Sequence, residues 1–156
     1  MKVFNLALAT SIFLFAACAN AAAPKFNHSG IQKGAYTESC YREPCSGAKV
    51  MQFNVVQKTP TSTLIKLKLV GASRNYNSKK IVWNHDFHNV YINCSLTRPT
   101  TQIEGNDEIT VLPINPTGVA GVYVSNAELY LAACHNYNGA IDKGARKFGY
   151  NVQESW

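Results

Sequence analysis

The chain has 156 residues, of which 46% are hydrophobic and 15% are charged, and its formal net charge is +6 at neutral pH. This length and composition predict one globular domain with a core of ordinary size, and they exclude a disordered chain and a repeat protein. The excess of positive charge favours acidic proteins, anionic polymers or membrane surfaces as partners.

The N-terminus has the pattern of a secretion signal. Lys2 precedes a mostly apolar stretch, and small residues follow up to Ala21 in an A-x-A cleavage pattern. We expect residues 1–21 to be removed and residues 22–156 to form one exported domain, periplasmic or secreted. Alternatively, residues 14–18 resemble a bacterial lipobox, in which case Cys18 would carry a lipid anchor. The apolar stretch is shorter than the roughly 20 residues that a bilayer requires, so we expect no transmembrane span.

Cleavage at this point leaves four cysteines, an even number that is typical of exported proteins with disulfides. A short, turn-like stretch that ends in proline separates Cys40 from Cys45 and predicts a local bridge, which leaves Cys94 to pair with Cys134. The second bridge would enclose roughly 41 residues and stabilise the fold by about 4 kcal/mol. The spacing of the first pair differs from Cys-x-x-Cys, so we expect no redox activity.

The first half of the mature chain predicts antiparallel β structure. One strand is expected over residues 50–57 and a second over residues 64–70, with the polar stretch 58–62 as the loop of a hairpin. In the second strand, apolar residues alternate with Lys66 and Lys68. This alternation predicts one buried face and one basic, solvated face.

A third, longer strand system is expected over residues 79–94, with a bend or a split near residues 84–86. Weaker strands are expected over residues 100–103, 108–113 and 119–124. These segments extend the predicted sheet without adding a second domain.

The pattern then changes to that of a helix. Ser125 and Glu128 have the S-x-x-E spacing of a capping box, which predicts a helix from about Asn126 to Asn136. A strand through residues 129–133 is the alternative, and residues 147–152 are expected to form a last strand. The predicted fold is therefore mainly β, of the α+β class: a small antiparallel sheet with one C-terminal helix and two disulfides.

Residues 83–88 hold two histidines and a carboxylate within a few positions. On a strand His85 and His88 would point to opposite faces, so we expect no metal site. Asp86 and His88 would share a face, and a carboxylate can orient an imidazole as a general base. A small hydrolase built on this pair is one hypothesis. The chain has no phosphate-binding glycine loop and no nucleophile elbow, and we expect neither a cofactor nor enzymatic activity.

A basic cluster follows the second predicted strand. Arginine and tyrosine often carry the binding energy of protein surfaces, and arginine also binds carboxylates and phosphates. We therefore predict a binding surface here, for which a solvated hairpin tip is the alternative interpretation. The candidate binding residues are Arg74, Tyr76, Lys79 and Lys80 in the connection, and Lys66 and Lys68 on the strand that leads into it.

Together these features favour an exported, non-enzymatic bacterial envelope protein that binds another protein with an acidic surface. In size, export and disulfide-bearing β character, the chain resembles small periplasmic lysozyme inhibitors and immunity proteins, and such a protein would inhibit a wall-degrading enzyme or a toxin. The resemblance is one of class, so no residue role is carried over from it. A binder of an anionic envelope polymer, or a surface accessory factor, is the alternative. We expect no nucleic-acid partner, because an exported protein is in the wrong compartment and aromatic residues do not recur through the basic stretch.

Overall fold

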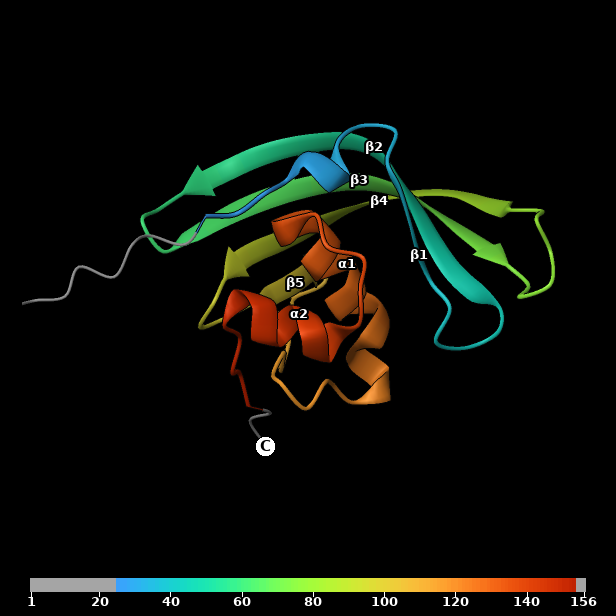
Figure 1. Cartoon of the computed structure of the whole chain (residues 1–156). Helices are drawn as coiled ribbons and strands as arrows, with labels where there is room; N and C mark the ends of the chain where they lie inside the picture. Colours follow the sequence, from blue (N-terminus) through green and yellow to red (C-terminus); the bar gives the residue numbers. More distant parts are fainter. Residues whose placement is uncertain (1–24, 154–156) are drawn as a thin grey trace, which may run out of the picture.

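The computed structural model describes residues 25–153. The predicted signal segment 1–21 and the alternative lipid anchor at Cys18 lie outside the described residues. The described chain forms one six-stranded antiparallel sheet whose strands follow one another in sequence order, and helices pack on one of its faces (Figure 1). Within residues 25–153, no helix is long and apolar enough to cross a membrane.

The strands are β1 (Tyr36–Ser39), β2 (Cys45–Lys58), β3 (Ser62–Arg74), β4 (Val82–Ser95), β5 (Thr100–Ile103) and β6 (Thr110–Val111). A short 3-10 helix, η1 (Ser29–Ile31), precedes the sheet. A second one, η2 (Gly121–Tyr123), leads directly into α1 (Val124–His135), and α2 (Ile141–Phe148) follows. The prediction of an antiparallel sheet with a helix after it is confirmed.

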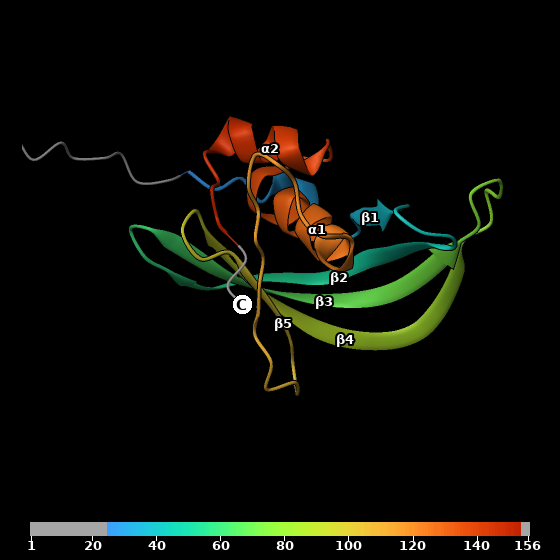
Figure 2. The ribbon, with the colours of Figure 1, turned by 90° about the horizontal axis from the view of Figure 1, so that it is seen from below.

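The three long strands β2, β3 and β4 curve around α1, which lies across their concave face (Figure 2). Ile65, Leu67 and Leu69 of β3 are buried on this face, whereas Lys66 and Lys68 are on the opposite, convex face. The alternation predicted for this strand is therefore confirmed. It determines which side of the sheet receives the helix, because successive side chains of a strand point to opposite faces.

The bend expected near residues 84–86 is present in β4. Val70 pairs with Phe87 and Ala72 pairs with Trp83, so that Gly71 alone lies opposite three residues of β4. His85 adopts a positive φ of 56° in this bulge. A Cβ atom at Gly71 would lie 2.5 Å from the side-chain amide of Asn84, so a larger residue here would displace that amide where the bulged strand approaches its neighbour.

Both predicted disulfides are confirmed: Cys40 pairs with Cys45, and Cys94 pairs with Cys134. The second bridge joins β4 to α1 within the core, where both sulfur-bearing residues are fully buried. Tyr130 and Leu131 of the same helix are also fully buried against the sheet. The bridge and the apolar face of α1 thus hold the helix in one position relative to the strands.

Two predicted strands are wrong, and one alternative is excluded. The helix predicted from about Asn126 to Asn136 is present as α1, which excludes the alternative strand over residues 129–133. Residues 119–124 contain η2 rather than a strand. Residues 147–152 hold the end of α2 instead of a strand. Ile141, Ala145 and Phe148 of α2 recur at helical spacing and pack on the core, and this burial outweighs the β propensity of the last residues.

The capping box is wrong as well, although the helix it predicted is present. The helix begins at Val124 as a continuation of η2, and no side chain caps its N-terminus. Ser125 instead donates a hydrogen bond to the hydroxyl of Ser39 in β1. A tertiary contact to the sheet has therefore replaced the local hydrogen bond that the motif predicts.

A buried polar network closes the core behind the Cys94–Cys134 bridge. The hydroxyl of Tyr130 donates to the carbonyl oxygen of Ser95 at 3.0 Å and bonds the hydroxyl of Tyr150 at 3.0 Å. Tyr150 in turn bonds Nε2 of His135 at 2.7 Å, and the imidazole stacks on Phe148. Burial, with a smaller contribution from the nearby His28, lowers the pKa of His135 to about 4.

This network predicts a loss of stability in mild acid. The unfolded chain takes up a proton on His135 below about pH 6.5, whereas the folded protein does not until about pH 4. Between about pH 6.5 and pH 4, His135 should lower the unfolding free energy by at most about 3 kcal/mol. Below pH 4 the residue is protonated in both states and should cause no further loss. Urea unfolding of the native chain and of His135→Gln between pH 7 and pH 4 measures the effect. An equal slope in the two proteins would contradict the assignment.

Candidate functional site

Two loops meet at one end of the sheet. The β1–β2 loop covers residues 40–44 and the β3–β4 loop covers residues 75–81. Because Cys45 at the start of β2 pairs with Arg74 at the end of β3, the two loops lie next to each other. We call residues 40–45 and 75–81 the two-loop surface.

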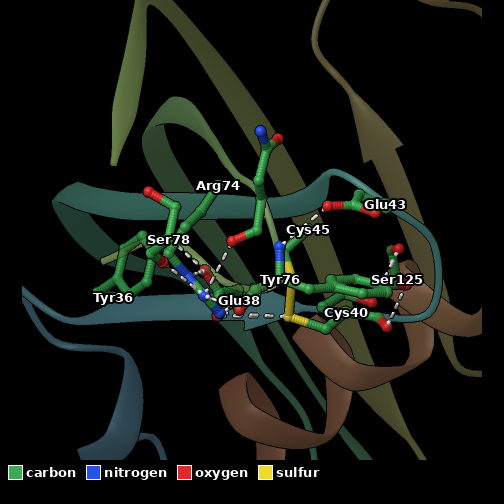
Figure 3. Close-up of a disulfide and its surroundings, with 11 residues drawn as sticks. Tyr36, Glu38, Cys40, Glu43, Cys45, Arg74, Tyr76, Ser78 and Ser125 are labelled. Carbon is green, nitrogen blue, oxygen red and sulfur yellow. Dashed lines mark hydrogen bonds and ion pairs between the residues drawn. A yellow bond between two sulfur atoms is a disulfide. The ribbon is translucent and has the colours of Figure 1, made fainter. Parts of the chain in front are cut away.

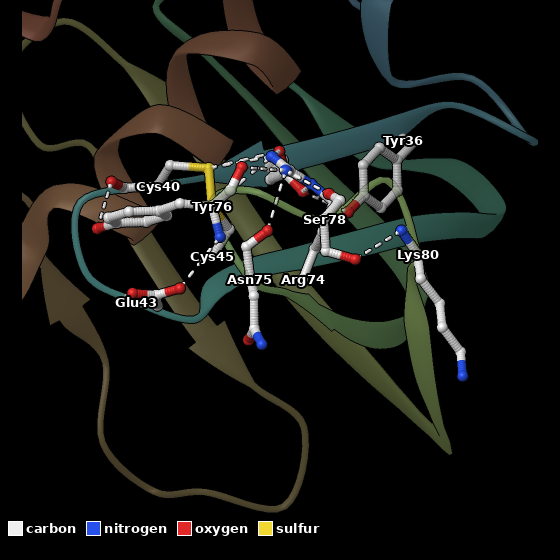
Figure 4. A network of polar contacts seen from close by, with 10 residues as sticks. Tyr36, Cys40, Glu43, Cys45, Arg74, Asn75, Tyr76, Ser78 and Lys80 are labelled. Carbon is white, nitrogen blue, oxygen red and sulfur yellow. Dashed lines mark hydrogen bonds and ion pairs between the residues drawn. A yellow bond between two sulfur atoms is a disulfide. The ribbon is translucent and has the colours of Figure 1, made fainter.

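Arg74 is the central residue beneath this surface. Its guanidinium donates to both carboxylate oxygens of Glu38, at 2.8 Å and 2.5 Å, and lies next to the sulfur atoms of the Cys40–Cys45 bridge (Figure 3). Nη1 of the same guanidinium donates to three carbonyl oxygens of the following loop, those of Asn75, Tyr76 and Ser78 (Figure 4). One side chain thus connects β1, β3 and the loop after β3.

The electrostatics of the pair agree with this geometry. The hydrogen bonds from Arg74 are the main cause that lowers the pKa of Glu38, and a hydrogen bond from the hydroxyl of Tyr36 contributes in the same direction. The side chain of Arg74 is only 22% exposed. Its bonding capacity is therefore largely used inside the protein, although the sequence prediction placed this residue among those that meet a partner.

Further contacts join the first loop to the second. The hydroxyl of Tyr76 donates to the carbonyl oxygen of Cys40 at 3.2 Å, and the backbone N–H of Tyr76 donates to Glu43 at 3.2 Å. The Cys40–Cys45 bridge closes the first loop on itself (Figure 3). The two loops are consequently held as one unit by a disulfide, an ion pair and hydrogen bonds between side chains and the backbone.

Large side chains project from this unit into solvent. Tyr41 is 53% exposed and Tyr76 is 45% exposed, and the guanidinium of Arg42 lies 5.7 Å from the centre of the Tyr41 ring. Lys79 and Lys80 are also exposed, and the side chain of Lys80 points away from the polar network (Figure 4). The surface therefore combines two aromatic rings with positive charge on a rigid support.

Lys66 and Lys68 lie elsewhere. Both are on the convex face of β3, where Lys66 forms an ion pair with Glu104 at 2.5 Å and Lys68 lies 5.6 Å from the centre of the Phe87 ring. Hydrogen bonds to Glu104, the strongest of them from Lys66, lower the pKa of its carboxyl group to about 2. The structure thus separates these two lysines from the loop residues with which the sequence grouped them.

The histidine-rich segment does not assemble into a site with a hydrogen-bonded pair. His85 and Asp86 are exposed in the bulge of β4, whereas His88 pairs with Leu69 and lines a cavity between the sheet and α1. Among residues 25–153, no hydrogen bond joins Asp86 to His88. The hypothesis of a hydrolase on this pair therefore gains no support from the described contacts.

One cluster has the spacing of metal ligands. Ligand atoms of Glu38, Cys40 and Cys45 lie within 4.8 Å of one another. The two sulfur atoms are bonded to each other, and the carboxylate already binds Arg74. A metal would need thiolates at this position, so the oxidised protein does not offer this set to an ion.

Sequence reasoning missed Glu38, Tyr41 and Arg42. The signals for the last two are present in the sequence, because an aromatic residue and an arginine lie inside a six-residue disulfide loop that is too small to bury them within itself. The pairing of Glu38 with Arg74 had no local signal, since the two are separated by 36 residues and meet only through the register of three strands.

Comparisons of the chain with protein-family models, with curated proteins and with solved structures found no match in any of the three. Function must therefore be argued from the residues and contacts of this chain.

The contacts of Arg74 predict that loop order depends on a guanidinium and not on a positive charge alone. Lysine cannot donate to two carboxylate oxygens and three carbonyls at once. In Arg74→Lys, the amides of residues 75–81 should exchange with solvent about tenfold faster. Hydrogen–deuterium exchange measures this effect, with Lys80→Ala as a control that should leave exchange unchanged. Native-like protection in Arg74→Lys would show that the loop is held by other contacts.

Proposed function

We propose that this chain is an exported, non-enzymatic protein that binds another protein through the two-loop surface. The observation that carries the proposal is the support beneath half-exposed aromatic residues: a disulfide and the Arg74–Glu38 pair hold both loops, and Tyr41 and Tyr76 each keep about half of their surface in solvent. A surface that is ordered before binding loses less conformational entropy when a partner docks. Tyrosine supplies a large contact area at low entropic cost.

The charge of the surface favours an acidic partner. Arg42, Lys79 and Lys80 are exposed, and none of the three belongs to an ion pair among the described residues. Unpaired cations around aromatic residues accelerate encounter with a negatively charged protein. Within the bacterial envelope, a wall-degrading enzyme or a toxin is the class of partner that we propose, and the chain would act as its inhibitor or immunity factor.

The shape of the surface supports inhibition. The first loop is a small ring closed by Cys40 and Cys45, and it projects beyond the strands that carry it (Figure 1). The hydroxyl of Tyr41 packs so closely on Gly121 of η2 that a Cβ atom there would lie 2.5 Å from it, so the ring is also supported from the helical side. A projecting loop that keeps one conformation suits insertion into a concave site.

An anionic envelope polymer is the second candidate, because the same exposed cations would bind it. The two candidates differ in what they require of the tyrosines. A polymer bound through charge alone should be released by salt and should tolerate the loss of Tyr41. A protein partner should depend on both the charges and the aromatic rings.

We predict that the lysines of the two-loop surface control the association rate and that its tyrosines control the dissociation rate. With a partner isolated from envelope extract by cross-linking, Lys79→Glu with Lys80→Glu should slow association about tenfold at low salt, because the encounter loses electrostatic attraction. Tyr41→Ala should mainly speed dissociation, by about tenfold or more. Surface plasmon resonance at two salt concentrations measures both rates.

Two variants on other parts of the molecule serve as matched controls. Lys143→Glu changes charge on α2, and Val55→Ala removes an exposed apolar side chain at the opposite end of β2. Both should bind like the native chain. If the controls weaken binding as much as the loop variants do, the two-loop surface is not the binding site.

A further inference from the structure

A cavity of about 370 Å³ lies between the concave face of the sheet and α1. It is separate from the exposed rings of the two-loop surface and plays no part in the function proposed above. Its volume falls within the range of pockets that bind small molecules. Leu69 and Val90 of the sheet and Leu129 and Ala132 of α1 supply apolar walls.

The charged residues that line this cavity are of one sign. They include Glu38, Glu108 and Glu128, and none of the described lining residues is a lysine or an arginine. This is the reverse of the whole chain, whose formal net charge is +6. The walls therefore favour a positively charged occupant and disfavour an anion.

Two of these three carboxylates form no ion pair with a lysine or an arginine of the described chain. Glu38 is neutralised by Arg74, whereas neither Glu108 nor Glu128 forms an ion pair within residues 25–153. Glu128 is the more informative of the two. It projects from α1, and its Oε2 atom is buried with no hydrogen-bond partner among the described residues.

A carboxylate in this position has lost water from one oxygen without gaining a donor. Such a group raises the free energy of the protein, and a cation placed beside the carboxylate offsets part of that cost. Thr37, Ser39 and Thr101 also line the cavity, and a hydroxyl group can accept a hydrogen bond from a positive group.

We propose that this cavity binds an organic cation: an ammonium or guanidinium group on a short apolar stem. The charged group lies beside Glu128, and the stem packs on Leu69, Val90 and Leu129. The apolar walls favour such a ligand over a hydrated metal ion, which would gain nothing from them. The same chemistry occurs in free amines and in the lysine or arginine side chains of a protein, and the test separates these two sources.

The test uses the mature protein labelled with nitrogen-15 and probes of defined structure. Agmatine and pentylamine represent free amines, and N-acetyl-glycyl-arginyl-glycinamide represents a side chain on a peptide. Pentanoate has the same apolar stem with the opposite charge. Titration to about 10 mM should shift the amide signals of cavity residues for at least one cationic probe and leave them in place for pentanoate. Shifts with the free amines alone identify a small-molecule site, and shifts with the tripeptide identify a side-chain site.

Two variants test the site itself. Glu128→Gln keeps the shape of the side chain and removes its charge, and it should weaken binding of the responding probe by about tenfold or more. Ala132→Leu keeps the charge and fills part of the cavity, and it should weaken binding as well. Asp142→Asn on α2 removes a carboxylate outside the cavity and should bind the probe like the native protein.

Three outcomes would overturn the proposal. These are the absence of shifts with every cationic probe, equal shifts with pentanoate, and native affinity in both cavity variants when their melting curves show that they are folded. Because Glu128→Gln and Ala132→Leu remove different properties, the failure of one to fold leaves the other as the test.

Discussion

The structure depends on the burial of α1 against the concave face of a single curved sheet. One face of β3 is apolar, and α1 supplies the buried Tyr130 and Leu131 that cover it. A sheet with one uncovered apolar face would not be stable in water, so the helix is part of the core and not an addition to it. The Cys94–Cys134 bridge fixes the helix to β4. The cavity beside Glu128, the support of Tyr41 on η2 and the contact between Ser125 and Ser39 all follow from this one placement.

Much of the sheet and both disulfides could be predicted because they follow from local sequence patterns. The alternation in residues 64–70 predicted both the strand and its buried face, and the short spacing of Cys40 and Cys45 fixed both disulfides by elimination. The C-terminal residues form a helix instead of the expected strand, because the helical spacing of Ile141, Ala145 and Phe148 lets them pack on the core and outweighs the β propensity of residues 147–152. The capping box failed for a different reason, since a contact to β1 that no local pattern contains uses the hydroxyl of Ser125.

The two-loop surface shows what composition alone cannot predict. The sequence predicts a cluster of cations and a tyrosine in one connection, but it cannot distinguish a cation that is free from one that is paired within the fold. Arg74 is held by Glu38 across three strands, and Lys66 is held by Glu104 on the other face of the sheet. The cations that remain available are Lys79 and Lys80, together with Arg42 from a loop that the prediction did not include. The partner of each charge is decided by strand register, which emerges only when the whole sheet is assembled.

In the function that we propose, a protein partner docks on the two-loop surface, and photo-crosslinking in living cells detects such a contact. A benzophenone amino acid is placed at position 41 or 80 of the two-loop surface, or at position 143 of α2 as a control. Irradiation should give the same discrete protein adduct from the two loop positions and none from the control. Adducts from position 143 with none from positions 41 and 80 would contradict this proposal.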